Sequence, residues 1–115
     1  MAHTDGSPVT DPLVERLRAQ VGGPRDGALL RFSIGNALLG DGMYDEAATS
    51  FREALAFDRD YSAAWKLLGK ALLAKDDETG AADAWREGVD AATRRGDIQA
   101  GKEMTVFLNR LSRKS

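Results

Sequence analysis

The stretch Trp65-Lys66-Leu67-Leu68-Gly69-Lys70-Ala71-Leu72 decides the fold, because its pattern of small and bulky residues recurs 34 residues earlier in the chain. Every match between the two copies pairs residues of the same size class. Small residues are needed where two helices cross closely, and bulky residues fill the space between helix pairs. A 34-residue period therefore predicts a stack of helical hairpins. The matched pairs are Ile34 and Leu68, Gly35 and Gly69, Ala37 and Ala71, Leu38 and Leu72, Ala47 and Ala81, Phe51 and Trp85, Ala54 and Gly88, and Leu55 and Val89.

Apolar residues also recur at helical spacing outside these two copies, and no stretch alternates with the period of two that a half-buried strand needs. Links of roughly 2–5 residues favour antiparallel neighbouring helices. We therefore predict an all-α protein in which Pro12 begins the first of six helices, Ser62 caps the fourth and Asp97 caps the sixth. The expected helices span residues 12–21, 28–39, 44–57 and 63–74, then a helix that contains Ala81 and reaches about residue 95, and last 97–113.

At these residues the chain resembles the tetratricopeptide repeat (TPR) family, whose pattern begins W-x2-L-G-x2-Y, continues A-x3-F and closes with P. The second copy reads W-x2-L-G-x2-L from Trp65 and A-x3-W from Ala81. The first copy reads I-G-x2-L from Ile34 and A-x3-F from Ala47, with Arg31 in place of the tryptophan. The resemblance implies a right-handed α-α superhelix, a TPR-like solenoid.

The resemblance covers two full repeats, residues 28–61 and 62–95, and both repeats lack the closing proline. The first helix resembles the second helix of a truncated earlier repeat and is expected to cap the N-terminal end. The last helix, 97–113, keeps one apolar face and turns polar on the other, as the cap of an open solenoid end must. We expect a disordered tail at residues 1–10 and one complete TPR-like domain over residues 11–115.

Composition narrows the function. The 115 residues are 43% hydrophobic and 30% charged, which suits one globular domain. A net charge of −2 argues against nucleic acid as the main partner. The chain has no cysteine, and its one histidine is His3. These absences leave little material for a metal site, a cofactor or nucleophilic catalysis, so we expect no cofactor and no enzyme activity.

Nothing in the sequence predicts membrane insertion. No apolar run approaches the roughly 20 residues needed to cross a bilayer. The polar start of the chain lacks the basic and then apolar order of a signal peptide. We therefore expect no membrane span and a cytoplasmic protein.

The TPR resemblance implies a protein–protein interaction module or adaptor, because the first helix of each repeat in that family lines a concave groove for peptides or partner helices. The last helix would extend this face. The residues expected there are Leu29, Phe32, Asn36 and Leu39 in the first repeat, Ala63, Lys66, Lys70 and Leu73 in the second, and Asp97, Ala100, Met104 and Phe107 in the last helix.

Two features of this face each allow two readings. Lys66 and Lys70 lie four residues apart on one helical face and repel each other unless an acidic group sits between them. They form either a site for an acidic partner segment, with Asn36 as a neighbouring donor, or a solvated face. Phe32, together with Leu29 and Leu39, forms either a hydrophobic pocket for a partner side chain or part of the packing.

Some co-chaperones of the TPR family hold a C-terminal carboxylate through lysine, asparagine and arginine residues on the first helices. Of those positions only Asn36 matches here. Phe32, Leu67, Asp97 and Gly101 occupy the others. The resemblance therefore argues against that clamp.

Two non-catalytic roles remain open. The chain is either an adaptor that binds a peptide or helix of another protein, or a self-associating structural subunit of a larger assembly. We expect a monomer or a weak homodimer, and concentration-dependent size would separate the two roles.

Overall fold

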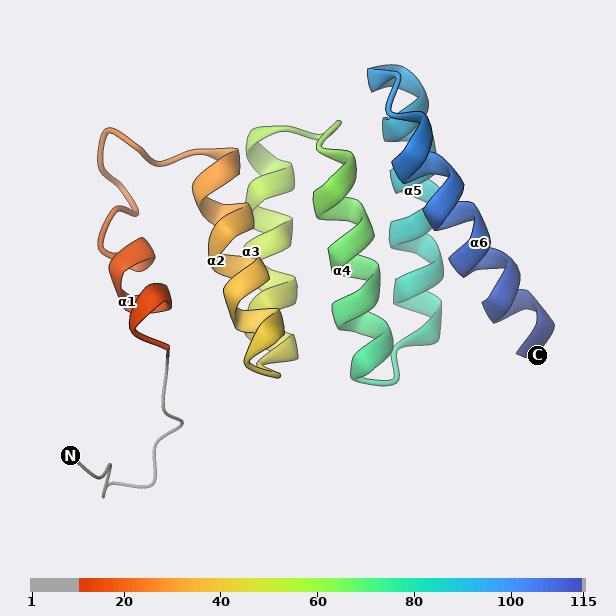
Figure 1. Ribbon diagram of the computed structural model, residues 1–115, viewed down its shortest axis with the longest axis horizontal. Coiled ribbons are helices and arrows are strands. Elements are labelled where there is room, and N and C mark those ends of the chain that lie inside the picture. The colour runs from red at the N-terminus through yellow and green to blue at the C-terminus, as the bar shows by residue number, and fades with distance from the viewer. Residues whose placement is uncertain (1–10, 115) are drawn as a thin grey trace.

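The structure is a computed structural model that describes residues 11–114, so the predicted disordered tail, residues 1–10, lies outside the described residues. Within that range all regular secondary structure is helical (Figure 1). The prediction of an all-α protein with six helices is confirmed. The helices are α1 (Pro12–Arg18), α2 (Ala28–Gly40), α3 (Tyr44–Phe57), α4 (Ser62–Ala74), α5 (Glu78–Arg95) and α6 (Ile98–Lys114).

The helices form a row of antiparallel pairs, α2 with α3 and α4 with α5, and α6 closes the row against α5 (Figure 1). Helix α1 packs on α2 at the other end. Helix α4 also contacts both α2 and α6, so these three helices form one continuous face. The molecule measures 46 × 35 × 18 Å, which makes it an elongated slab.

One contact is repeated in both helix pairs: an aromatic ring of the second helix lies directly on a glycine of the first. A Cβ atom on Gly35 would stand 2.7 Å from Phe51 Cε1, and one on Gly69 would stand 2.1 Å from Trp85 Nε1. The indole nitrogen of Trp85 also donates a 3.0 Å hydrogen bond to the carbonyl oxygen of Lys66. Each glycine therefore admits a ring that would otherwise push the two helices apart.

The 34-residue period stops at α6 because α5 is longer than α3, with 18 residues against 14. Helix α5 ends at Arg95, and its C-cap Gly96 has a φ of +76°, in the left-handed region that favours glycine. Helix α6 then begins 36 residues after α4 instead of 34. Its buried residues Ala100 and Met104 accordingly follow Ala64 and Leu68 by 36 positions.

Two local expectations are wrong. Helix α1 ends at Arg18 instead of residue 21, and it buries Val14, while Leu13 and Val21 are each 41% exposed. Ala19 is the C-cap of this helix, and the chain then continues in tight backbone turns through residue 21.

Ser62 does not cap α4, because the helix already begins at this residue. Its hydroxyl group instead donates a 2.6 Å hydrogen bond to Asp97 Oδ2. Asp97 caps α6 as predicted, since its other oxygen accepts from the backbone N–H of Ala100 at 3.2 Å. These two hydrogen bonds hold the pKa of Asp97 below its usual value, and they tie the starts of α4 and α6 together.

An ion-pair network replaces the missing tryptophan of the first repeat. Arg31 binds both carboxylate oxygens of Asp26 at 2.9 Å and lies 3.1 Å from Glu53 on α3. Asp26 also accepts the backbone N–H groups of Gly22 and Gly27 at 2.9 Å. The Arg31 hydrogen bonds and these backbone donors keep the pKa of Asp26 well below its usual range. The network fastens the α1–α2 loop to the first repeat.

We predict that Gly69→Ala destabilises the protein by roughly 1–3 kcal/mol, because the added methyl group overlaps the Trp85 ring. The matched control is Gly40→Ala in α2, where a Cβ would meet nothing within 4 Å. This control should be neutral or stabilising by about 0.5 kcal/mol. Urea unfolding followed by circular dichroism measures both values. Equal stability of the two variants would contradict the packing argument.

We also predict that Asp26→Asn lowers the melting temperature at pH 7, and that this difference shrinks in acid. The folded-state pKa of Asp26 is depressed, so its stabilisation is present above the unfolded pKa of about 3.9 and is lost as the pH falls toward the folded value. Melting curves between pH 7 and pH 2 test this. The exposed Asp90 provides the control variant Asp90→Asn, which should follow the wild-type pH profile.

Candidate functional site

A cleft of about 410 Å³ opens between α4 and α6 on the face shared by α2, α4 and α6. We call it the α4–α6 groove. Its wall and floor are mainly apolar, and its rim carries three basic side chains. The lining residues are Lys70 and Leu73 from α4, Trp85 from α5, and Phe107, Arg110, Leu111 and Lys114 from α6.

The ring of Phe107 organises the groove. It lies 5.1 Å from the Trp85 ring, measured between centroids. Lys70 Nζ stands 5.2 Å from the centroid of the same ring, and Arg110 Cζ stands 6.0 Å from it. Cation–π contacts of this kind contribute about 0.5–1 kcal/mol each at exposed sites. One aromatic ring therefore gathers two cations at the mouth of an apolar cleft.

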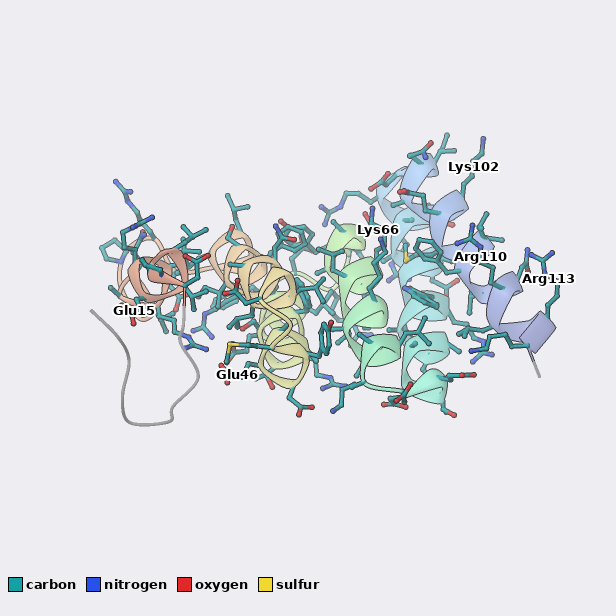
Figure 2. All side chains as sticks on the ribbon, turned by 60° about the horizontal axis from the view of Figure 1, so that its bottom comes forward. Glu15, Glu46, Lys66, Lys102, Arg110 and Arg113 are labelled. Atoms are coloured by element: carbon teal, nitrogen blue, oxygen red, sulfur yellow. The ribbon has the colours of Figure 1, made fainter. Side chains whose placement is uncertain are left out.

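Two of the three cations at this mouth are not balanced by an acidic side chain of the described residues. Within residues 11–114, neither Lys70 nor Arg110 forms an ion pair, whereas Lys114 lies 3.2 Å from Glu78. Figure 2 shows Lys102, Arg110 and Arg113 following one another along α6. Two neighbouring cations without an acid favour the approach of an anionic group.

Helix α6 separates the two lysines that the sequence places on one face. Lys66 is half-buried and pairs with Glu103 at 3.2 Å, on the side of α4 that faces α6 (Figure 2). Lys70 lies one turn further on and meets Phe107 instead. The acidic group expected between the lysines is therefore supplied to Lys66 from within the protein, and Lys70 remains available at the groove.

Comparison with known proteins identifies the family. The chain is 45% identical over 101 residues to the TPR repeat-containing protein PA0015 of Pseudomonas aeruginosa, a match that covers 88% of this chain and 96% of that protein. The chain belongs to the tetratricopeptide repeat family. Its fold is also similar to the solution structure of protein BPP2914 from Bordetella parapertussis, with a TM-score of 0.78 and 44% identity over 90% of each chain. No family model matches the chain.

Membership of the TPR family gives the broad function. Repeats of this family generally mediate protein–protein interactions and are typically non-catalytic. In the part of the chain that the structure describes, no group of three or more acidic or histidine side chains is placed to hold a metal ion. No described helix is long and apolar enough to cross a membrane.

The α2 residues expected on the TPR concave face lie outside the α4–α6 groove. Phe32 is half-buried and stacks on Tyr61, with ring centroids 4.9 Å apart. Leu39 is also half-buried and packs against the core. Leu29 is 71% exposed, and Asn36 is exposed as well. Phe32 and Leu39 therefore contribute to packing, and Leu29 and Asn36 present their side chains to solvent.

Among the residues of the last helix expected on the concave face, some are buried or hydrogen-bonded and one lines the groove. Ala100 and Met104 are buried and line no open surface. Asp97 is occupied by its hydrogen bonds with Ser62 and the Ala100 amide. Phe107 lines the groove beside Lys70 and Leu73. The tertiary structure thus brings Lys70, Leu73 and Phe107 of the predicted surface together in the groove. Most of the other predicted residues are packed, paired or exposed away from it.

Three groove residues on α6 escaped the sequence analysis. In sequence, Arg110 and Lys114 suit the C-terminal end of a helix dipole as well as they suit a binding site, and Leu111 is typical of the apolar core face of a helix. A usable signal was present: Arg110, Leu111 and Lys114 follow Phe107 by three, four and seven residues, which places all four on one helical face.

Proposed function

We propose that this TPR protein is an adaptor that binds a segment of a partner protein in the α4–α6 groove of its concave face. The observation that supports this function is the pair of cations, Lys70 and Arg110, held over the Phe107 ring at the mouth of the cleft. Exposed cations beside an open apolar cleft suit a ligand that carries both an acidic group and an apolar side chain.

The segment combines an acidic group with a bulky apolar side chain. A carboxylate between Lys70 and Arg110 relieves the repulsion between these cations and forms charge-assisted hydrogen bonds with them. The apolar side chain lies against Leu73 and Leu111, in a cleft of about 410 Å³. An interface of this size fits micromolar, transient binding.

The partner segment continues from the groove along the concave face toward α2. Leu29 and Asn36 are exposed there and are free to contact it. Phe32 and Leu39 shape this surface from below through their packing on the core. Lys66 supports the groove indirectly, because its ion pair with Glu103 ties α4 to α6.

Selection of peptides from a random display library tests this function. We predict that the wild-type protein selects peptides with an acidic residue beside a bulky apolar residue. Reversal of the groove charges in Lys70→Glu/Arg110→Glu should lower the affinity for these peptides at least tenfold, because it turns attraction into repulsion. Fluorescence anisotropy measures this affinity. Lys66→Gln should change their affinity less than about threefold, the scale of one exposed ion pair.

The matched control is Arg16→Glu/Arg113→Glu, which changes the net charge equally on α1 and at the end of α6, outside the groove lining. This control should keep wild-type affinity, and circular dichroism should show the same helicity for all variants. Selected peptides that bind the groove variant as tightly as the wild type would overturn the proposal. Sedimentation that shows stable self-association blocked by the groove substitutions would favour a structural subunit instead.

A further inference from the structure

A second hollow lies where α5 runs into α6, at the opposite end of α6 from Arg110. Its volume is about 640 Å³, against about 410 Å³ for the α4–α6 groove. We call it the α5–α6 hollow. Apart from Asp97 and Lys102, its lining is small or apolar, with hydroxyl groups at two threonines. The lining residues are Val89, Ala92, Thr93, Gly96, Asp97, Ile98, Gly101, Lys102, Thr105 and Val106.

In the preceding repeat, a tryptophan side chain lies at the corresponding helix junction. A smaller hollow of about 390 Å³ lies between α3 and α4, and Trp65 lines it. The indole nitrogen of Trp65 donates a 2.8 Å hydrogen bond to the carbonyl oxygen of Arg59, at the end of α3. The Trp65 side chain thus covers the junction between the second helix of one repeat and the first helix of the next.

At the α5–α6 junction this tryptophan is absent. The 36-residue offset that relates the buried residues of α4 and α6 places Gly101 at the position of Trp65. Thr93 follows Arg59 by 34 residues but lies inside α5, where its carbonyl oxygen accepts the backbone N–H of Gly96 at 3.2 Å. A Cβ on Gly101 would meet only Ala92, at the ordinary contact distance of 3.5 Å. The α5–α6 hollow therefore has no aromatic side chain at the position from which Trp65 covers the earlier junction.

The edges of the hollow are exposed and charged on one side. Ile98 is 72% exposed and Val106 is 44% exposed, so both are available to contact a ring in the hollow. Asp97 is already engaged with Ser62 and Ala100. Lys102 is exposed and forms no ion pair within the described part of the chain. The local charge is therefore positive and complements an acidic group.

We propose that the α5–α6 hollow binds a tryptophan-type side chain of a partner protein, with an acidic residue of the partner next to it. The ring takes the place that Trp65 holds one repeat earlier, between Ala92, Gly101 and Val106. The acidic residue pairs with Lys102. This site is separate from the α4–α6 groove.

Like charge makes a second copy of this chain a poor occupant. An antiparallel contact between two α6 helices about a twofold axis through the hollow would bring the Lys102 side chain of each copy toward that of the other. The hollow lining supplies no free carboxylate to offset this repulsion, because Asp97 is the only acid in it and is already bound. A heterologous, acidic partner removes this conflict.

The test titrates the full chain with the blocked dipeptide N-acetyl-Trp-Glu-amide and follows backbone amides by two-dimensional NMR. We expect shifts at Gly96, Gly101 and Thr105. N-acetyl-Leu-Glu-amide should bind more weakly because it lacks the ring. N-acetyl-Trp-Gln-amide should also bind more weakly, by up to about fivefold, because it lacks the charge. Lys102→Gln should remove the difference in affinity between N-acetyl-Trp-Gln-amide and N-acetyl-Trp-Glu-amide.

Filling the hollow from within provides the decisive variant. Gly101→Trp should abolish dipeptide binding at these amides and should melt at a higher temperature than Gly101→Ala, the control that adds helix propensity without the ring. Gly101→Ala should retain the shifts.

Three results would overturn the proposal. The first is a Gly101→Trp variant that melts below Gly101→Ala, because the hollow would then not accept an indole. The second is a set of shifts confined to Lys70, Leu73 and Leu111. The third is wild-type self-association in sedimentation that Gly101→Trp abolishes, because a second copy would then cover the hollow. The second result would support peptide binding by the Lys70 and Arg110 pair, and the first and third leave that binding in place, so failure of this proposal is distinguishable from failure of the proposed function.

Discussion

The close contact between an aromatic ring and a glycine is the constraint on which the rest of this structure depends. Phe51 on Gly35 and Trp85 on Gly69 set the separation of the helices in each pair, because the rings occupy the space where a Cβ atom would stand. Two hairpins built on the same contact then stack through α4, which contacts α2, α3, α5 and α6. A glycine that looks dispensable in an isolated helix thus determines the geometry of the whole row.

Helix α6 closes this row and also builds both candidate binding surfaces. It is placed by buried contacts of Ala100 and Met104 and by the hydrogen bond from Ser62 to Asp97. From that position Glu103 neutralises Lys66, and Phe107 collects Lys70 and Arg110. The extra length of α5 moves α6 by two residues relative to the repeat. That offset puts Gly101 where a tryptophan stands in the repeat before, and so leaves the α5–α6 hollow open.

The sequence predicted the repetitive part of the protein well and its interfaces less well. The 34-residue period, the helix pairs and the glycine positions follow from local spacing and residue size, which act through contacts that recur in each repeat. The role of Arg31 did not follow in this way, because it depends on Asp26 in a loop and Glu53 in another helix. The positions of α1 and the Ser62 hydroxyl also depend on partners distant in the chain.

The sequence by itself determined the helical class, the TPR repeat and the face that carries Lys70, Leu73 and Phe107. Only the tertiary structure decided which cations on that face remain available. Lys66 and Lys70 are equivalent in sequence spacing, yet one meets a carboxylate and the other meets an aromatic ring. The physical reason is that a cation is neutralised only where packing brings a carboxylate within ion-pair distance. The register of α6, set by the length of α5 and its glycine end, is not encoded in the spacing of the lysines.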